Sequence, residues 1–306
     1  MKPLLVITLC LCFSISYAQD FQSLIQEGNA KYDAKEYTDA AKLYDQALEM
    51  KEGSASNYYN AACYTALAGN DKKAMQYLIK SSEKGWKDVS WMKKDSDLKS
   101  LHDKEGWEKA TSIAQANLDE YEKDLDKPLM AQLEAIHVKD QTLRQLYREA
   151  EEKFGRESEE MKYFWSLVNE QDSLNELEVI KIIDERGWVG KSVVGGKANM
   201  TIWLVIQHAP LETQEKYLPM LRESVKQGES SGSHLALLED RIQMRNGNPQ
   251  TYGSQITMNP ETGQQEVYEI KDPEYVNQRR KEVGLGPIQD YVKRWGIEWT
   301  VEQKEK

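Results

Sequence analysis

Two stretches near the start of the chain decide its fold: GNAKYDAKEYTDAAKLYDQA at residues 28–47 and ACYTALAGNDKKAMQYLIKS at residues 62–81. The second follows the first at a fixed offset of 34 residues. Small or bulky side chains recur at four matching positions, which pair Gly28 with Ala62, Ala40 with Ala74, Tyr44 with Leu78, and Ala47 with Ser81. A period of this length predicts stacked helical hairpins.

The recurring positions have a physical meaning. We expect Gly28, Ala40 and Ala62 where two antiparallel helices cross closely, because a larger side chain would push the helices apart. Tyr44 and Leu78 are expected to fill the space between one helix pair and the next. Each pair buries its apolar face only against a neighbour, so the array needs a cap.

Residues 86–117 follow the two repeats and have the pattern of a degenerate third unit. The segment DSDLKSLHDKEGWEKA, residues 95–110, places Leu98, Leu101, Trp107 and Ala110 on one apolar face. We interpret this unit as the cap.

On these residues the segment 21–82 resembles the tetratricopeptide repeat family. The second helix of each unit matches more closely than the first. Lys31 and Thr65 replace the aromatic residue of the family, and Glu52 stands where its loop proline usually lies. The resemblance implies a surface that binds another protein or a peptide, and a generic pair of helical hairpins is the alternative.

The first 18 residues are typical of a signal peptide. Lys2 precedes the apolar stretch LLVITLCLCFSI, which is shorter than the ~20 residues that span a bilayer. Ser16-Tyr17-Ala18 then predicts cleavage before Gln19 and export to the periplasm or the extracellular space. The alternatives are an uncleaved anchor or a buried N-terminal helix, and Leu11 before Cys12 disfavours a lipoprotein.

Charge and cysteine content exclude several classes of protein. The formal net charge is −11 and no basic stripe accumulates, so nucleic acid is not expected as a partner. Cleavage would leave Cys63 alone, without a partner for an internal disulfide. No apolar run after Ala18 is long enough to cross a membrane, so no integral span is expected.

The remainder of the chain has a mainly helical pattern with one hairpin. We expect a linker helix over 118–127, and a domain over 128–306 that begins at Pro128. Helices are predicted at 174–184, 200–208, 212–226, 233–245, 273–283 and 288–295, with a glycine loop at 190–196. Strands are predicted at 250–258 and 264–270, joined by a turn. The predicted class is thus mainly α, a tetratricopeptide-type helical repeat (19–117) followed by a helical domain with one small β-hairpin (α+β).

Seven short motifs occur in order along this second part. They are DQxxR (Asp140, Gln141, Arg144), DxxN (Asp172, Asn175), GW (Gly187, Trp188), QHA (Gln207 to Ala209), DR (Asp240, Arg241), QTYGSQ (250–255) and DPxxVNxRRxxVGL (272–285). Their order over 128–292 resembles the bacterial family catalogued as domain of unknown function 6624. The resemblance implies a domain but no activity.

Ten polar residues in or beside these motifs are candidates for one pocket: Gln141, Arg144, Gln207, His208, Asp240, Arg241, Gln250, Tyr252, Gln255 and Arg279. In this hypothesis His208 is a general base, Asp240 orients it, and Arg241 or Arg279 binds an anion. The alternative is structural, with Asp240 and Arg241 at a helix end and His208 in the core. A regular strand would place Gln250 and Gln255 on opposite faces, unless Gly253 forms a bulge.

Motifs for metal, cofactor and nucleophile are missing. The four histidines stand apart, no cysteine pair remains, and no GxSxG occurs. GKSVVGGK at 190–197 differs from a phosphate-binding loop in spacing, and Ala198 replaces its Ser or Thr. We therefore expect neither a metal nor a cofactor.

These observations favour an exported interaction protein. Its repeat would bind another protein or a peptide, and its C-terminal domain would add a second binding surface. The alternative is an extracytoplasmic hydrolase or transferase with a polar site around His208 and Asp240. A small-molecule sensor built from the same residues is a third possibility.

Overall fold

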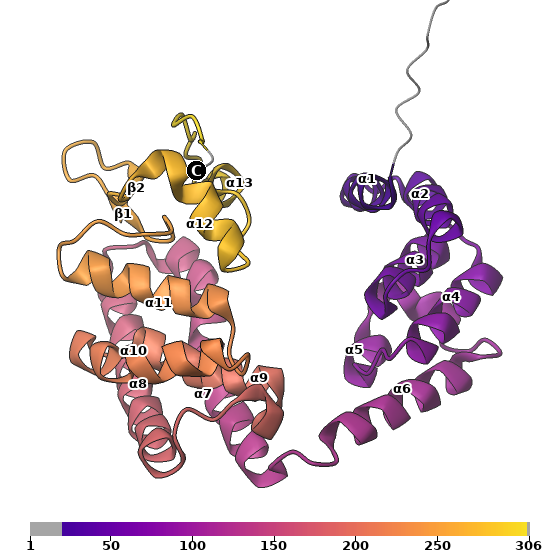
Figure 1. The fold of residues 1–306 in the computed structure, drawn as a ribbon, viewed down its shortest axis with the longest axis horizontal. Coiled ribbons are helices and arrows are strands. Elements are labelled where there is room, and N and C mark those ends of the chain that lie inside the picture. Colours follow the sequence, from indigo (N-terminus) through magenta and orange to yellow (C-terminus); the bar gives the residue numbers. More distant parts are fainter. Residues whose placement is uncertain (1–19, 305–306) are drawn as a thin grey trace, which may run out of the picture. The chain divides into compact units, whose positions relative to one another are not determined.

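The computed structural model describes residues 20–304. The predicted signal peptide and its cleavage site lie outside these residues. The chain divides into two compact units, the first ending at Lys123 and the second beginning at Asp124, and each is described by itself (Figure 1). Among the described residues, no helix is both long and apolar enough to cross a membrane.

The first unit consists of helical hairpins followed by two short helical elements and one longer helix (Figure 1). Its elements are α1 (Phe21–Asp33), α2 (Tyr37–Met50), α3 (Ala55–Leu67), α4 (Asp71–Glu83), α5 (Val89–Lys94), the 3₁₀ helix η1 (Ser96–Leu101) and α6 (Trp107–Glu122). Side-chain caps stabilise the first turns of two of these helices. Asp20 accepts a hydrogen bond from the Ser23 amide at the start of α1, and Ser54 and Asn57 form a capping box at the start of α3.

The periodic small residues lie where the helices of this unit pack most closely. A Cβ atom added to Gly28 would lie 2.7 Å from the Tyr44 ring, and Ala40, Ala62 and Ala74 are fully buried. The expected close crossing is therefore confirmed. The core of the unit also contains Leu98, Leu101 and Ala110, with Trp107 packed against it, as expected of the capping segment.

The second unit begins with two long helices and continues with three shorter ones. They are α7 (Lys127–Phe154), α8 (Glu159–Arg186), α9 (Lys191–His208), α10 (Leu211–Lys226) and α11 (Gly232–Arg245). Asp126 caps α7 through the Leu129 amide, with Pro128 in the first turn. The core gathers apolar side chains from all five helices, among them Leu133, Ile183, Ile202, Leu221 and Leu238.

The helix boundaries differ from the predicted ones in three places. Helix α8 begins at residue 159, well before the predicted start at 174. The glycine loop expected at 190–196 is instead the start of α9, in which Gly195 adopts a positive φ of 77° and bends the helix. The segment 118–127, predicted as a linker helix, contains the end of α6, a short connection and the first residue of α7.

A small sheet and short helices complete the unit. Strand β1 (Ile256–Met258) pairs antiparallel with β2 (Gln265–Val267), and η2 (Pro273–Tyr275), α12 (Val276–Glu282), α13 (Ile288–Val292) and η3 (Lys293–Trp295) follow. The predicted mainly α class with one small hairpin is confirmed. Both strands are shorter than predicted, and residues 250–255 form a loop instead of the start of β1.

Candidate functional site

A buried carboxylate on α7 meets the end of α9. Asp140 is only 1% exposed; its Oδ1 lies 3.1 Å from His208 Nδ1, and its Oδ2 accepts from Gln141 Nε2 at 2.6 Å. Burial alone would raise the pKa of Asp140. The hydrogen bond from His208, the charge of Arg144 and the hydrogen bond from Gln141 outweigh burial and lower this pKa. Asp140 is therefore ionised.

His208 is the last residue of α9, and only one of its ring nitrogens is engaged. A carboxylate beside Nδ1 favours the tautomer that carries the proton there, which leaves a lone pair on Nε2. Nε2 has no hydrogen-bond partner within residues 20–304, and the side chain is 17% exposed. The ring is therefore held in place by Asp140, with Nε2 available to accept a proton or a ligand.

Arg144 connects this pair to α8. Its Nη1 donates to the Asp140 carbonyl at 2.9 Å, and its Nη2 donates to Asp172 Oδ2 at 2.7 Å. Asp172 Oδ1 and, one turn further along α8, Asn175 Nδ2 are buried and have no partner in the described part of the chain. Asn175 itself is fully buried. The region thus holds polar atoms that the protein's own hydrogen bonds leave unused.

Two arginines of α11 approach the same region from the other side. Arg241 Nη1 donates to the Gln207 carbonyl at 3.2 Å, and Arg245 Nη1 donates to the Ala209 carbonyl at 2.9 Å. Both carbonyls lie at the C-terminal end of α9, where the helix dipole is negative. Burial, and then the charges of Arg245 and Arg144, lower the pKa of Arg241. The three arginines bond to the carbonyls of Asp140, Gln207 and Ala209, which lie around His208.

A metal ion is a poor fit to this cluster. Ligand atoms of Asp140, Asp172 and His208 lie within 4.8 Å of one another, which is a spacing that a metal ion accepts. However, the Arg144 guanidinium already bonds to Asp172 and lies 3.7 Å from Asp140 Oδ1. A cation bound to both carboxylates would have to displace this arginine, so the arrangement fits an ion-pair network better.

Asp240 belongs to a different, structural group. Its fully buried carboxylate accepts from the backbone amides of Thr251, Tyr252 and Ser254, at 2.7, 2.9 and 2.9 Å. Burial raises the pKa of Asp240, and these amides act in the opposite direction. The loop turns at Gly253, whose φ is +70°. Asp240 thus fixes the fold of this loop.

The two glutamines of this loop bind each other. Gln250 Nε2 donates to the Gln255 carbonyl at 3.0 Å, and the Gln255 amide donates to Gln250 Oε1 at 2.8 Å. The interpretation of the segment as a strand with a bulge is therefore wrong, because the turn at Gly253 brings the glutamines together. Arg279 closes the loop by donating to the carbonyls of Thr251 and Lys271.

The ten predicted residues therefore fall into two groups. Gln141, Arg144, Gln207, His208 and Arg241 surround the end of α9, whereas Asp240, Gln250, Tyr252, Gln255 and Arg279 build the loop at 250–255. The expected contact between His208 and Asp240 is replaced by the contact between His208 and Asp140.

Three further residues at the end of α9 were not among the ten candidates. Asp140 and Asp172 stand in the motifs DQxxR and DxxN but were not selected for the pocket. Arg245 lies outside every motif, and nothing in the sequence singles it out.

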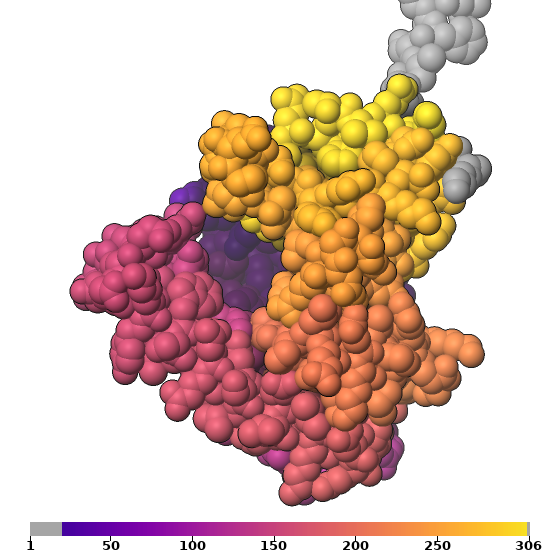
Figure 2. Space-filling model, turned by 90° about the vertical axis from the view of Figure 1, so that its left-hand side faces the viewer, coloured from indigo at the N-terminus to yellow at the C-terminus, as the bar shows by residue number. Residues whose placement is uncertain are grey.

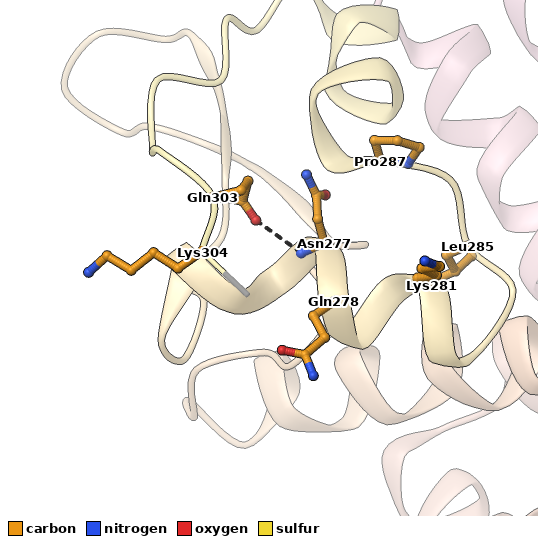
Figure 3. Close-up of a pocket in the computed structure, with 7 residues that line it drawn as sticks. All are labelled: Asn277, Gln278, Lys281, Leu285, Pro287, Gln303 and Lys304. Carbon is orange, nitrogen blue, oxygen red and sulfur yellow. Dashed lines mark hydrogen bonds between the residues drawn. The ribbon is translucent and has the colours of Figure 1, made fainter. Parts of the chain in front are cut away.

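A separate cavity lies elsewhere in the second unit. It measures about 670 Å³ and is lined by residues of α12, the following loop and the C-terminal segment, none of them among the ten candidates (Figure 3). Among its lining residues, the Asn277 amide donates a hydrogen bond to Gln303 Oε1 at 3.0 Å. Its lining residues include no histidine, aspartate or glutamate.

The surface of the second unit is hollowed on the side of the long helices. Figure 2 shows a recess between the pink region, where α7 is joined to α8, and the orange and yellow region of β1, β2 and α12. Helix α9 packs along α7. It ends at His208, well before α7 reaches its C-terminal end at Phe154. Solvent therefore reaches the side of α7 and α8 beyond the end of α9.

Comparison with known proteins identifies one relationship. The model of a family described as "Family of unknown function (DUF6624)" matches residues 123–302, which include both groups of candidate residues. The resemblance inferred from the ordered motifs is thereby confirmed for the C-terminal domain. The N-terminal part is consistent with a helical repeat, although no tetratricopeptide model matches. No curated protein and no solved structure matches the chain.

Proposed function

This chain belongs to the DUF6624 family, and we propose that its family domain binds a small anionic ligand beside His208. One observation carries the proposal. Within residues 20–304 the half-buried guanidinium of Arg241 bonds only to a backbone carbonyl, and its buried Nε has no partner. Arg144 and Arg245 bond to the nearby carbonyls of Asp140 and Ala209. We call Arg144, His208, Arg241 and Arg245 the α9-end cluster.

The electrostatics of the α9-end cluster favour an anion. A charge that is partly removed from water is costly unless it is paired. Arg241 is half-buried, and within residues 20–304 only Arg144 of the three arginines forms ion pairs, with Asp140 and Asp172. A phosphate or carboxylate group would accept hydrogen bonds from the free donors of Arg241 and Arg245. It would also lower the repulsion between their charges.

Unused polar atoms extend the site beyond the charges. Gln207 is 5% exposed and Asn175 is fully buried, and Gln207 Oε1 and Asn175 Nδ2 have no partner in residues 20–304. One of these atoms accepts and the other donates. Together with Asp172 Oδ1 they suit a ligand that bears hydroxyl groups as well as its anionic group.

The test measures anion binding by the mature full-length chain. Inorganic phosphate, sulfate and acetate serve as probes in isothermal titration calorimetry and thermal-shift assays. We expect saturable binding that Arg241→Gln weakens at least tenfold, whereas Arg148→Gln leaves it unchanged. Arg148 is a matched control because it is an exposed arginine of the same unit. Equal effects of both substitutions, or binding unaffected by Arg241→Gln, would contradict the proposal.

A second candidate for the domain is catalysis, as a hydrolase or a transferase. It rests on the His208–Asp140 pair, since a ring held through Nδ1 with a free Nε2 is the arrangement of a general base. p-Nitrophenyl phosphate and p-nitrophenyl acetate are suitable first substrates. His208→Asn should abolish any turnover, and Asp140→Asn should reduce it. Turnover that survives His208→Asn would exclude this function.

For the N-terminal unit we propose that it binds a partner protein or peptide outside the cytoplasm. Two observations support this proposal. Residues 1–18 have the pattern of a signal peptide, and the repeat has the 34-residue period of the tetratricopeptide family, which uses its repeats to bind protein partners. The repeat would bring a partner protein or peptide close to the family domain, outside the cytoplasm.

A further inference from the structure

The first unit contains a pocket that the α9-end cluster does not use. It measures about 350 Å³ and lies between α1, α3, α5 and η1. Its lining residues are Tyr32, Tyr59, Asn60, Cys63, Tyr64, Trp91, Lys94, Asp95, Ser96 and Asp97. We call it the tyrosine–aspartate pocket. Aromatic rings and two carboxylates meet in it, and each class constrains what it binds.

The carboxylates are held in place by neutral donors. Asp95, 8% exposed, accepts from the Tyr59 hydroxyl at 2.8 Å and from the Cys63 thiol at 3.6 Å. Asp97 accepts from the Tyr32 hydroxyl at 2.7 Å. These donors orient the two negative charges but do not neutralise them, and neither aspartate forms an ion pair with a lysine or arginine of residues 20–304.

The aromatic rings form the walls. Tyr32 stacks on Tyr64 with 4.5 Å between ring centroids, and Tyr59 stacks on Trp86 at 3.9 Å. Stacking on a second ring fixes the orientation of Tyr32 and Tyr59. Trp91 is 53% exposed, which is unusual for so large an apolar side chain. Ring faces beside carboxylates are a favourable environment for an organic cation, through cation–π and ionic attraction.

We propose that the tyrosine–aspartate pocket binds a lysine or arginine side chain of a partner polypeptide. A guanidinium or ammonium group would pair with Asp97 and Asp95, and the alkyl stem would lie against Trp91. The volume admits a side chain of this length, since ligand pockets begin at ~300 Å³. This inference rests on the proposed binding role of the repeat and is independent of the anion site.

A metal ion is the competing occupant. Ligand atoms of Cys63, Asp95 and Asp97 lie within 4.8 Å of one another. Burial raises the pKa of the Cys63 thiol, and the protonated thiol donates a hydrogen bond to Asp95. A thiol binds metal as its thiolate, so the observed hydrogen bond favours the organic cation.

The test uses the mature full-length chain and two oriented peptide libraries. In one library a central arginine is flanked by random residues other than cysteine, and in the other the centre is citrulline, the neutral isostere of arginine. We expect the arginine library to bind at least tenfold more tightly than the citrulline library. This difference in affinity should shrink as the salt concentration rises. Equal binding of both libraries overturns this inference but leaves the binding role of the repeat in place. Binding of neither library overturns both.

Substitutions locate the binding in the pocket. Asp97→Asn keeps an acceptor for Tyr32 but removes the charge, and should weaken the arginine library at least tenfold. Trp91→Ala, on an exposed side chain, should weaken it severalfold. Asp103→Asn, an exposed aspartate of the same unit, should have no effect. Unchanged binding in Asp97→Asn overturns the proposal, as does stoichiometric Zn²⁺ binding that Cys63→Ser abolishes.

Discussion

Asp140 and His208 are 68 residues apart in the sequence, yet Asp140 Oδ1 and His208 Nδ1 lie 3.1 Å apart in the fold. The contact joins the middle of α7 to the last residue of α9. It engages Nδ1 of His208 and leaves Nε2 without a partner among residues 20–304. The catalytic role proposed as the second candidate depends on this contact.

The His208–Asp140 contact predicts the tautomer of the ring. In the wild-type chain, ¹⁵N chemical shifts should show neutral His208 protonated at Nδ1, because the ionised Asp140 accepts a hydrogen bond from this nitrogen. Asp140→Asn removes the charge, so the preference for this tautomer should weaken and the free energy of unfolding should fall by ~1–3 kcal/mol. A ring already protonated at Nε2 in the wild type would contradict the geometry.

The stability of the second unit should depend on pH through His234. Its ring stacks on Trp203 with centroids 4.1 Å apart, and burial lowers its pKa. Below pH ~6.5 the unfolded chain binds a proton at this residue that the folded chain resists. The free energy of unfolding should therefore decrease from pH 7 to pH 5. Denaturant titrations of His234→Phe, which keeps an aromatic ring, should show a smaller decrease; an equal decrease would assign the effect to other groups.

The repeat should not tolerate larger side chains at its periodic positions. Ala40 and Ala74 are fully buried, so Ala40→Leu and Ala74→Leu should each lower the free energy of unfolding by ~1–3 kcal/mol through overpacking. Ala30→Leu, at an exposed position of α1, is the control. If thermal melts of both buried variants coincide with the wild type, the alignment of the repeat is incorrect.

Two glycines separate the strain of a positive φ from the lack of space. Gly253 and Gly263 have φ of +70° and +66°, but a Cβ on Gly253 would lie 2.5 Å from Ile288 Cδ1, whereas no atom lies within 4 Å of one on Gly263. Gly263→Ala should cost about 1 kcal/mol from strain alone. Gly253→Ala should cost clearly more in denaturant titrations. Equal costs would show that the loop at 250–255 is not held as tightly as its contacts to Asp240 indicate.

Export predicts a defined N-terminus. Lys2, the apolar stretch and Ser16-Tyr17-Ala18 predict cleavage before Gln19. N-terminal sequencing of the protein from its native host should therefore begin at or near Gln19. An intact Met1 on protein isolated from the cytoplasm would refute the prediction.

The sequence alone determined features that depend on local pattern. The 34-residue offset from Gly28 to Ala62 predicted the helical repeat, because close helix crossings recur at a fixed spacing along the chain. The ordered motifs predicted the family of the second domain. The turn at 259–263 predicted the hairpin. The length of its first strand was overestimated, since residues 250–255 form a loop that Asp240 holds.

The tertiary structure alone decided which polar residues meet. Asp240 and Arg241 are neighbours in the sequence, but successive side chains on α11 point in different directions, so one holds the loop at 250–255 and the other binds the end of α9. His208 bonds to Asp140 because α9 packs along α7 and ends beside that residue. Likewise, Tyr32 and Asp97 meet only after the first unit has folded. Periodicity determines which face of a helix is buried, whereas the packing of helices distant in sequence determines which polar groups share that surface.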